Sequence, residues 1–416
     1  MIQLSQETRD LLLNNSVYRE IILRFPNEDP NEALEIGSSN IVSESFELTQ
    51  SICDSKEFRL GGGITGKMEI SVIGVDAELT GKTVNVFLKS TYSLNRLVPS
   101  PTLYPSPTLI IGEPRQTVEY QLFSGKVHSA KKQKNRAVKR ITAYDAMYDF
   151  SKKSISANAL TSYDDHHQSP RPQLKAFTLD LLNYLFDYSD IYNDSTAGFS
   201  NTKYLLFDRD SINAAVKKGV AVIELLKAYA EANAGFIICA GDGSLRVKSL
   251  SEYVNPGTSD FTTRKKSVDE IIPAYRSLSF EEYTTKPITY LSFMYRNDNK
   301  YGYGNSADAN SWYVSENIIF RMCSDISHFV TGYWNTNGGN YIFYNLLSFK
   351  PFKADVFARW WLEPGDRVQI RTGYNDVETV DSFVLSRRIK GINGMSVTIE
   401  AKGSEYLDNK EVDSIE

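Results

Sequence analysis

The sequence predicts a mainly β protein with an α/β insert in its middle third. Three observations lead to this fold class. Over roughly the first 150 residues, apolar side chains alternate with polar ones, which is the period of a half-buried strand. In the middle third the apolar residues recur every three or four positions, which is the period of an amphipathic helix. In the last third the alternation returns, so the helical segment stands between two β segments.

Length and composition are those of a soluble globular protein. The 416 residues correspond to roughly two to four domains. Hydrophobic residues make up 41% of the chain and charged residues 23%. The net charge of −5 excludes a global basic field that would attract nucleic acid or an anionic membrane. The 25 tyrosines favour half-buried sheet or contact surface.

The cysteines and the N-terminus predict a protein that folds in the cytoplasm. Cys53, Cys239 and Cys323 are far apart and form no CxxC pair, so a disulfide framework is not expected. The first residues, MIQLSQETRDLLLNNS, lack the basic and apolar regions of a signal peptide. No stretch approaches the ~18 uncharged apolar residues of a membrane helix, so we expect no membrane anchor.

The first third contains the clearest alternation. Met68, Ile70 and Val72 share one face of a strand predicted over residues 68–75, and residues 83–88 repeat the pattern. Further strand candidates are residues 18–25, 41–48 and 117–127. Short strands separated by turn signals are typical of a sandwich or a barrel. Residues 96–114 hold five prolines and are predicted to leave the sheet as a long loop.

The middle third predicts two helices and a hairpin. Apolar residues at helical spacing indicate helices around residues 179–186 and 222–229. The second helix is expected to stop near Gly235. Residues 236–239 and 245–248 then form a predicted hairpin around the turn Asp242-Gly243.

The last third is predicted to be β again. Its strand candidates are residues 288–294, 312–320, 368–372, 383–386 and 395–402. The expected domains are therefore a first β domain at 1–150, an α/β insert at 151–275 and a second β domain at 276–416.

A short echo links the first and last thirds. Residues 80–86 and residues 364–370 each place a glycine, Gly81 or Gly365, just before an alternating strand of the same phase. A later strand in each third, at residues 141–143 and 399–401, is followed by a tyrosine close to an aspartate, Tyr144-Asp145 in the first case and Tyr406-Leu407-Asp408 in the second. Two interpretations stay open, a module used twice and a coincidence of common turn patterns.

Two segments imitate a phosphate-binding loop. Residues 61–67, GGGITGK, have the GxxxxGK spacing, but Met68 follows where Ser or Thr is needed. The segment around Lys82 has Asp76 in place of the first glycine. Each continues as a strand, so no helix N-terminus would face an anion. We interpret both matches as coincidences.

No other pattern predicts a catalytic or metal site. Asp164-Asp165-His166-His167 is interpreted as a solvated loop, because in an extended segment at most two of the four side chains could converge on a metal. The basic run at residues 131–136 is interpreted as an exposed hairpin tip. No GxSxG or HExxH motif is present. We therefore expect no catalytic residue, no metal and no cofactor.

Segments along nearly the whole chain resemble one protein family. They are residues 40–48 (NIVSESFEL), 79–82 (LTGK), 140–149 (RITAYDAMYD), 351–354 (PFKA) and 361–366 (WLEPGD). In this order they resemble the tail-hub proteins of phages and prophages of Gram-positive bacteria, the family that includes prophage tail endopeptidase-like (tail-associated lysin) proteins. The segment at residues 335–345 departs from the family, whose members tend to have a helix there.

The resemblance implies a non-enzymatic baseplate hub. Its fold would be two related antiparallel β-barrels joined by the α/β insert. Three copies would form a ring of six barrels that adapts a hexameric tail tube to trimeric tip components. The implied partners are a distal tail ring protein, a tape measure protein and other baseplate or tail-tip proteins. DNA would pass through the channel without sequence-specific binding.

The resemblance also implies a place for the protein and a limit on its activity. It would belong to the virion tail and be assembled in the host cytoplasm. Relatives that cut peptidoglycan do so with an added C-terminal domain, which we do not expect in a chain that ends at Glu416.

Two other functions remain as alternatives. The first is a receptor- or glycan-binding tail protein, for which the tyrosines would form a binding surface. A ring with an axial channel favours the hub, whereas a concave aromatic groove favours the binder. The second is an NTPase or hydrolase, which needs a site that the sequence does not show.

Overall fold

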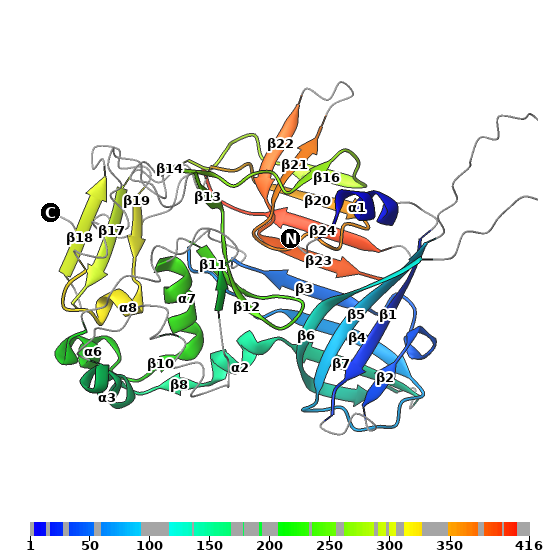
Figure 1. Cartoon of the computed structure of the whole chain (residues 1–416), viewed down its shortest axis with the longest axis horizontal. Helices are drawn as coiled ribbons and strands as arrows, with labels where there is room; N and C mark the ends of the chain where they lie inside the picture. Colours follow the sequence, from blue (N-terminus) through cyan, green and yellow to red (C-terminus); the bar gives the residue numbers. More distant parts are fainter. Residues whose placement is uncertain are drawn as a thin grey trace, which may run out of the picture.

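The structure is a computed structural model (Figure 1) that describes residues 4–13, 17–27, 33–53, 60–92, 116–134, 137–167, 178, 191–193, 207–232, 235–254, 262–286, 290–296, 299–304, 312–326, 348–372, 378–392 and 395–405. In these residues the protein is mainly β, as the sequence predicts, with few helices and one large antiparallel sheet. The division into two barrels and a middle domain, with the boundaries given above, stays a prediction.

The first strand set lies at the lower right of Figure 1. It consists of β1 (Tyr18–Phe25), β2 (Leu34–Ile36), β3 (Glu47–Ser51), β4 (Lys67–Ile73), β5 (Thr83–Tyr92), β6 (Gln116–Lys132) and β7 (Val138–Tyr144). The strands predicted at residues 18–25, 68–75, 83–88 and 117–127 are confirmed.

The strand predicted at residues 41–48 is wrong in its first half. Ile41 makes a single bridge to Val72 of β4, and the continuous strand β3 starts only at Glu47. Between them Glu44 has a φ of 58°, a left-handed conformation that interrupts a strand. The strand ladders of this set do not close into a barrel in the described residues.

The helices and a small sheet follow in the middle of the chain. The helices are α2 (Ala146–Lys152), α3 (Ala157–His167), α6 (Arg209–Ala215) and α7 (Val222–Ala232). The short strands β8 (Ser154–Ile155) and β10 (Val220–Ala221) pair with each other. The strands β11 (Gly235–Cys239) and β12 (Leu245–Ser249) form the predicted hairpin, and β9 (Ile191–Asn193) runs parallel to β12. The helix predicted at residues 179–186 lies outside the described residues, as do the proline-rich loop and residues 335–345.

The second strand set lies at the top of Figure 1. It consists of β15 (Glu270–Ile272), β16 (Ser277–Phe280), β20 (Phe352–Phe357), β21 (Arg367–Arg371), β22 (Thr379–Phe383), β23 (Ser386–Lys390) and β24 (Ser396–Ala401). The strands predicted at residues 368–372 and 395–402 are confirmed. The strand predicted at 383–386 is wrong, because the chain bends there from β22 into β23.

A separate three-stranded sheet lies between β16 and β20 in the chain. It contains β17 (Tyr290–Tyr295), β18 (Asn299–Gly304) and β19 (Trp312–Ser315), and the helix α8 (Ile318–Arg321) follows. The strand predicted over residues 312–320 is therefore wrong after Ser315. Asn317 caps the helix, since its side chain accepts hydrogen bonds from Ile319 at 3.0 Å and Phe320 at 3.4 Å.

Four small elements complete the fold. The helix α1 (Gln6–Leu12) lies near the N-terminus, η2 (Ser38–Asn40) is one turn of 3₁₀ helix, and β13 (Ser251–Val254) pairs with β14 (Thr262–Lys265). Within the described part of the chain, no helix is both long enough and apolar enough to cross a membrane.

Candidate functional site: the joint between the two strand sets

One eleven-stranded antiparallel sheet contains strands of both sets. Its order is β16-β20-β24-β23-β3-β4-β7-β6-β5-β1-β2. The two sets meet where β3 pairs with β23, from Ser51 opposite Ser386 to Glu47 opposite Lys390. These strands are more than three hundred residues apart in sequence, yet they form neighbours in one ladder (Figure 1). We call this pairing the joint.

One face of the sheet around the joint is polar and carries paired charges. Arg388 of β23 contacts Glu47 of β3 through two nitrogens, at 2.8 and 2.9 Å. Arg140 of β7 and Lys67 of β4 both contact Glu69, at 3.2 and 3.1 Å. The pKa of Glu47 is lowered, chiefly by its hydrogen bonds from Arg388. These basic groups are therefore largely neutralised by neighbouring carboxylates.

The opposite side of the joint is buried and held by an arginine. Arg387 of β23 is fully buried, and its Nε donates to Gln50 of β3 at 2.8 Å. The same guanidinium donates to the carbonyl of Trp360 at 2.8 Å and to that of Leu362. A planar donor group of this kind can satisfy several acceptors at once. It ties β3 of the first set to the second set.

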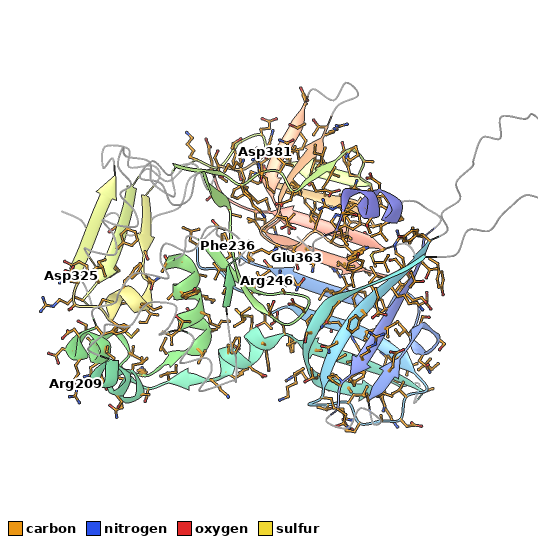
Figure 2. All side chains as sticks on the ribbon, in the orientation of Figure 1. Arg209, Phe236, Arg246, Asp325, Glu363 and Asp381 are labelled. Carbon is orange, nitrogen blue, oxygen red and sulfur yellow. The ribbon has the colours of Figure 1, made fainter. Side chains whose placement is uncertain are left out.

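A second buried group ties the middle hairpin to the same place. Lys248 of β12 lies 3.0 Å from Glu363 and 3.4 Å from Asp366, and all three side chains are buried. Figure 2 labels Glu363, close in this view to Arg246 of the hairpin that contains Lys248. Burial by itself raises the pKa of each carboxyl, but the positive charges around them outweigh it and the pKa of both is lowered. Lys248 contributes most, with Arg387 acting on Glu363 and Lys266 on Asp366. We call Gln50, Lys248, Glu363, Asp366 and Arg387 the junction cluster.

The two glycines of the sequence echo make the same backbone turn. Gly81 has a φ of +82° and Gly365 a φ of +93°, a region that favours glycine. The NH of Gly81 donates to Val127 at 2.8 Å, and that of Gly365 donates to Val384 at 2.7 Å. In both places the valine donates back to the residue after the glycine, at 2.9 and 2.8 Å. The resemblance between residues 80–86 and 364–370 therefore extends to their hydrogen bonds.

The glycine run at residues 61–67 is a packing seam. The NH of Gly61 donates to Gly235 at 2.8 Å, and the carbonyl of Gly62 accepts from Ile237 at 3.0 Å. A Cβ on Gly62 would stand 2.0 Å from the carbonyl oxygen of Ile52, which no side chain can tolerate. The glycines thus let β11 approach the first strand set closely, and Lys67 begins strand β4 rather than a helix.

Asp145 fastens the helix that follows the first set. Its carboxylate caps α2 by accepting from Met147 at 3.1 Å and also accepts from Gly66 at 2.8 Å. Burial raises the pKa of Asp145 to about 8, although both backbone hydrogen bonds act to lower it. The Tyr-Asp pattern at residues 144–145 therefore marks the end of β7 and the start of α2.

The remaining sequence candidates do not meet at one site. Residues 164–167 lie at the end of helix α3 and not in the predicted loop, and no group of three metal-ligating side chains exists among the described residues. Lys131 and Lys132 end β6 and are exposed, as expected for a hairpin tip. Cys239 and Cys323 are buried and Cys53 is half-buried, and none of the three forms a disulfide in the described residues.

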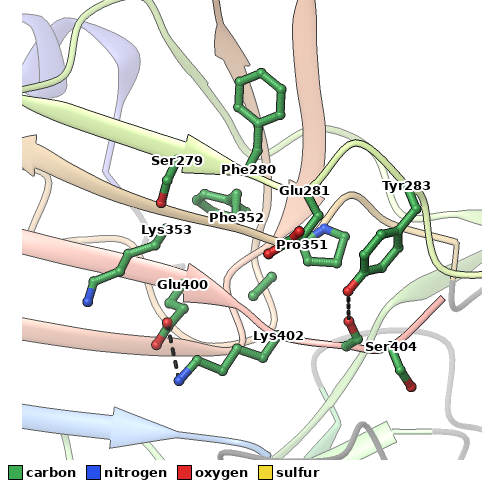
Figure 3. Close-up of a pocket in the computed structure, with 12 residues that line it drawn as sticks. Ser279, Phe280, Glu281, Tyr283, Pro351, Phe352, Lys353, Glu400, Lys402 and Ser404 are labelled. Atoms are coloured by element: carbon green, nitrogen blue, oxygen red, sulfur yellow. Dashed lines mark hydrogen bonds and ion pairs between the residues drawn. The ribbon is translucent and has the colours of Figure 1, made fainter.

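A pocket of about 490 Å³ opens at the edge of the second set (Figure 3). Its walls come from the ends of β16, β20 and β24, and Tyr283 hydrogen-bonds the carbonyl of Gly403 at 2.8 Å. The aromatic lining residues are Phe280, Tyr283 and Phe352.

Sequence reasoning missed the junction cluster. Residues 361–366 carry a family resemblance, but nothing in their local pattern indicates that Glu363 and Asp366 contact Lys248. Charged residues in strands normally face solvent, so Lys248 and Arg387 carry no signal of burial. The one local signal is the turn at residues 363–366, which places the carboxylates of Glu363 and Asp366 on either side of Gly365.

No protein-family model matches the sequence, and no curated protein matches it. Among solved structures, the chain is similar to "the tail protein from Neisseria meningitidis MC58", with 9% identity and a TM-score of 0.48 over 94% of this chain and 98% of that one. It is also similar to the prophage MuSo2 43 kDa tail protein from Shewanella oneidensis, with 12% identity and a TM-score of 0.46 over 92% and 97%. The phage P2 baseplate in its activated conformation gives 9% identity and a TM-score of 0.32 over 92% and 98%.

Proposed function

We propose that this chain is a structural hub of a phage-like tail, a homotrimer that adapts a hexameric tail tube to trimeric tip components. The observation that carries the proposal is the joint, where two strand sets with the same glycine turn continue one sheet. A chain built from two such units contributes two similar units to a ring. Three chains around a threefold axis then contribute six similar units and mimic sixfold symmetry. The family resemblance of residues 140–149 and 361–366 supports the same function.

The polar face of the sheet is proposed to line the axial channel. DNA would have to pass along this wall, and free lysines or arginines would bind its phosphates. Arg388 and Arg140 are instead paired with glutamates across the strands. Such a wall suits passage without sequence-specific binding. The proposed partners are a distal tail ring protein, a tape measure protein and other baseplate or tail-tip proteins.

Electron microscopy of assembled tails tests the hub. The expected result is three copies of the chain around the tail axis, with both strand sets facing the channel. Single copies at fibre tips, away from the axis, would contradict the proposal.

A receptor- or glycan-binding tail protein is the second candidate, favoured by the pocket of Figure 3. Tyr283 and Phe280 offer aromatic surface there, and Glu281 and Glu400 offer carboxylates. Binding of host-surface glycans that is lost in Tyr283→Ala would favour this function over the hub.

A further inference from the structure

The two strand sets follow the same order outward from one edge. In the first set the order is β3-β4-β7-β6-β5-β1, and in the second it is β16-β20-β24-β23, continued through the bend by β22-β21-β15. The long β6 thus corresponds to β22 and β23 together. In the first set β6 pairs with β5, the strand after the glycine turn, and then with β7, the last strand. In the second set β22 pairs with β21, the strand after the glycine turn, and β23 pairs with β24, the last strand. One difference is that β15 runs parallel to β21, whereas β1 runs antiparallel to β5.

Under this correspondence β3 is equivalent to β16, and β23 is equivalent to the end of β6. The edge of the first set, β3, pairs with β23 of the second set. Two equivalent edges remain, namely β16 and the end of β6. Among the described residues, β16 pairs only with β20, and residues 129–132 of β6 pair only with β7. Unpaired strand edges of this kind are templates for another chain.

Both open edges are exposed to solvent. Every residue from 273 to 282 is exposed except Leu278, which is half-buried. Phe280 exposes 44% of its surface. Lys131 and Lys132 are exposed at the end of β6. An exposed aromatic side chain beside an unpaired edge is a feature that monomeric proteins normally avoid.

The correspondence also sets a register between these edges. Leu48 lies opposite Met68 in the first set, and Phe280 lies opposite Phe352 in the second. Met68 and Phe352 in turn lie opposite Ala143 and Ala401, the alanines of the two echoed segments. Phe280 therefore corresponds to Leu48, and Glu281 to Thr49, the next residue.

The other side of the register follows in the same way. Ser386 lies opposite Glu400, and Ser129 lies opposite Thr142, the residue that corresponds to Glu400. Lys131 therefore corresponds to Arg388, which lies opposite Thr49 in the joint. If the two open edges pair as the joint does, Glu281 of one chain lies opposite Lys131 of the next. Opposite charges at such a position stabilise a sheet, whereas like charges destabilise it.

We propose that residues 280–283, at the end of β16 and just after it, pair antiparallel with residues 129–132 of β6 of a second copy of this chain, with Glu281 opposite Lys131. The contact is head-to-tail, so repeated pairing gives a ring if the rotation closes. The limit of three copies rests on the proposed function. Pairing would also cover Phe280 and close the open side of the pocket in Figure 3 with Lys131 and Lys132 of the neighbouring copy.

Cysteine cross-linking tests the pairing. The matched variant is Lys131→Cys with Glu281→Cys, in a Cys53→Ser background that leaves Cys239 and Cys323 buried. The control variant is Lys131→Cys with Ser277→Cys, because Ser277 starts β16 on the same edge and lies four residues before Glu281. This shift is about 13 Å along a strand, beyond the reach of a disulfide. Mild oxidation is applied to assembled tails and to the concentrated purified chain, followed by non-reducing electrophoresis.

The expected result is cross-linked dimers and trimers from the matched variant and none from the control. Equal cross-linking by both variants, or none in either preparation, would overturn the pairing. A chain found on the tail axis without the cross-link would overturn the pairing and leave the hub intact. Cross-linking of the purified chain, with no chain on the tail axis, would overturn the hub and leave the pairing intact.

Charge exchange is a second test that does not depend on cysteines. Glu281→Lys is expected to weaken self-association, and adding Lys131→Glu is expected to restore it. Failure of the double variant to recover would contradict the predicted register.

Discussion

At the scale of single residues, the buried charges of the junction cluster are matched one to one. The junction cluster contains Lys248 and Arg387 on one side and Glu363 and Asp366 on the other. A buried ion pair of this kind contributes little net stability, because desolvation offsets the attraction. Removing one partner is costly, since the other charge stays buried alone. The cluster therefore selects one arrangement of β3, β12 and β23.

Lys248 provides a direct test of this view. Lys248→Met is expected to lower the free energy of unfolding by about 3–5 kcal/mol, because Glu363 and Asp366 then repel each other in a buried site. The control is Lys227→Met, whose partner Glu224 is exposed, with an expected change of about 0.5 kcal/mol or less. Urea unfolding measures both. Equal losses in the two variants would show that the cluster does not act as a buried unit.

Asp145 is expected to make stability depend on pH. Its pKa is raised to about 8 by burial, above the ordinary value of about 3.9 in the unfolded chain. Between these values the folded state holds the extra proton, so the free energy of unfolding falls as pH rises toward 8. The slope is at most about 1.4 kcal/mol per pH unit.

The measurement is urea unfolding between about pH 5 and about pH 9, for the protein and for Asp145→Asn. Asparagine also caps helices but has no ionisable group, so it removes the pH-dependent part. A constant difference between the two proteins across this range would contradict the raised pKa.

At the scale of elements, close backbone contact decides how the hairpin β11–β12 meets the first strand set. Residues 61–63 run beside β11, where Gly62 accepts a hydrogen bond from Ile237. The absence of side chains at these glycines lets the backbone of β11 approach closely, which any larger residue would prevent. The same letters in the sequence imitate a phosphate loop only because both uses require glycine.

Gly62→Ala is expected to lower the free energy of unfolding by about 1–3 kcal/mol or more, because its Cβ would stand 2.0 Å from the Ile52 carbonyl oxygen. Gly37→Ala is the matched control, since a Cβ there meets nothing within 4 Å. Its stability is expected to be within about 0.5 kcal/mol of the parent protein. Thermal unfolding compares the two, and similar losses would contradict the seam.

At the scale of the whole molecule, the joint turns two strand sets into one surface. The polar face runs from the first set across β3 and β23 into the second set. Two of its ion pairs, Arg140–Glu69 and Arg388–Glu47, join neighbouring strands, so each of these arginines is neutralised by the strand beside it. The face presents charge to solvent without a strong field of one sign.

This balance predicts weak binding to DNA. The double variant Glu47→Gln with Glu69→Gln frees Arg388, Arg140 and Lys67 and is expected to bind duplex DNA more tightly than the parent. Its affinity is also expected to fall more steeply with salt, by up to about three additional released counterions. Glu224→Gln, away from this face, is the control. A filter-binding series across salt concentrations measures the slope, and equal slopes in both variants would contradict the role of the paired charges.

Local sequence was enough to determine the strands and turns that depend on near neighbours. Alternation predicted β1, β4, β5 and β24, and Asp242-Gly243 predicted the hairpin. The pair Gly81 and Gly365 predicted equivalent turns, since a glycine with positive φ is a local requirement. The same reasoning failed at residues 312–320 and 383–386, where the helix cap of Asn317 and the bend after β22 interrupt an apolar run.

Only the tertiary structure decided which distant segments meet. The pairing of β3 with β23 and the contact of Lys248 with Glu363 join parts of the chain separated by more than one hundred residues. Neither leaves a local pattern, because an edge strand looks the same before and after it finds a partner. A buried lysine likewise has the same neighbours in sequence as an exposed one. Periodicity reports which face of a strand is apolar, whereas hydrogen-bonding edges and buried charges are satisfied only in three dimensions.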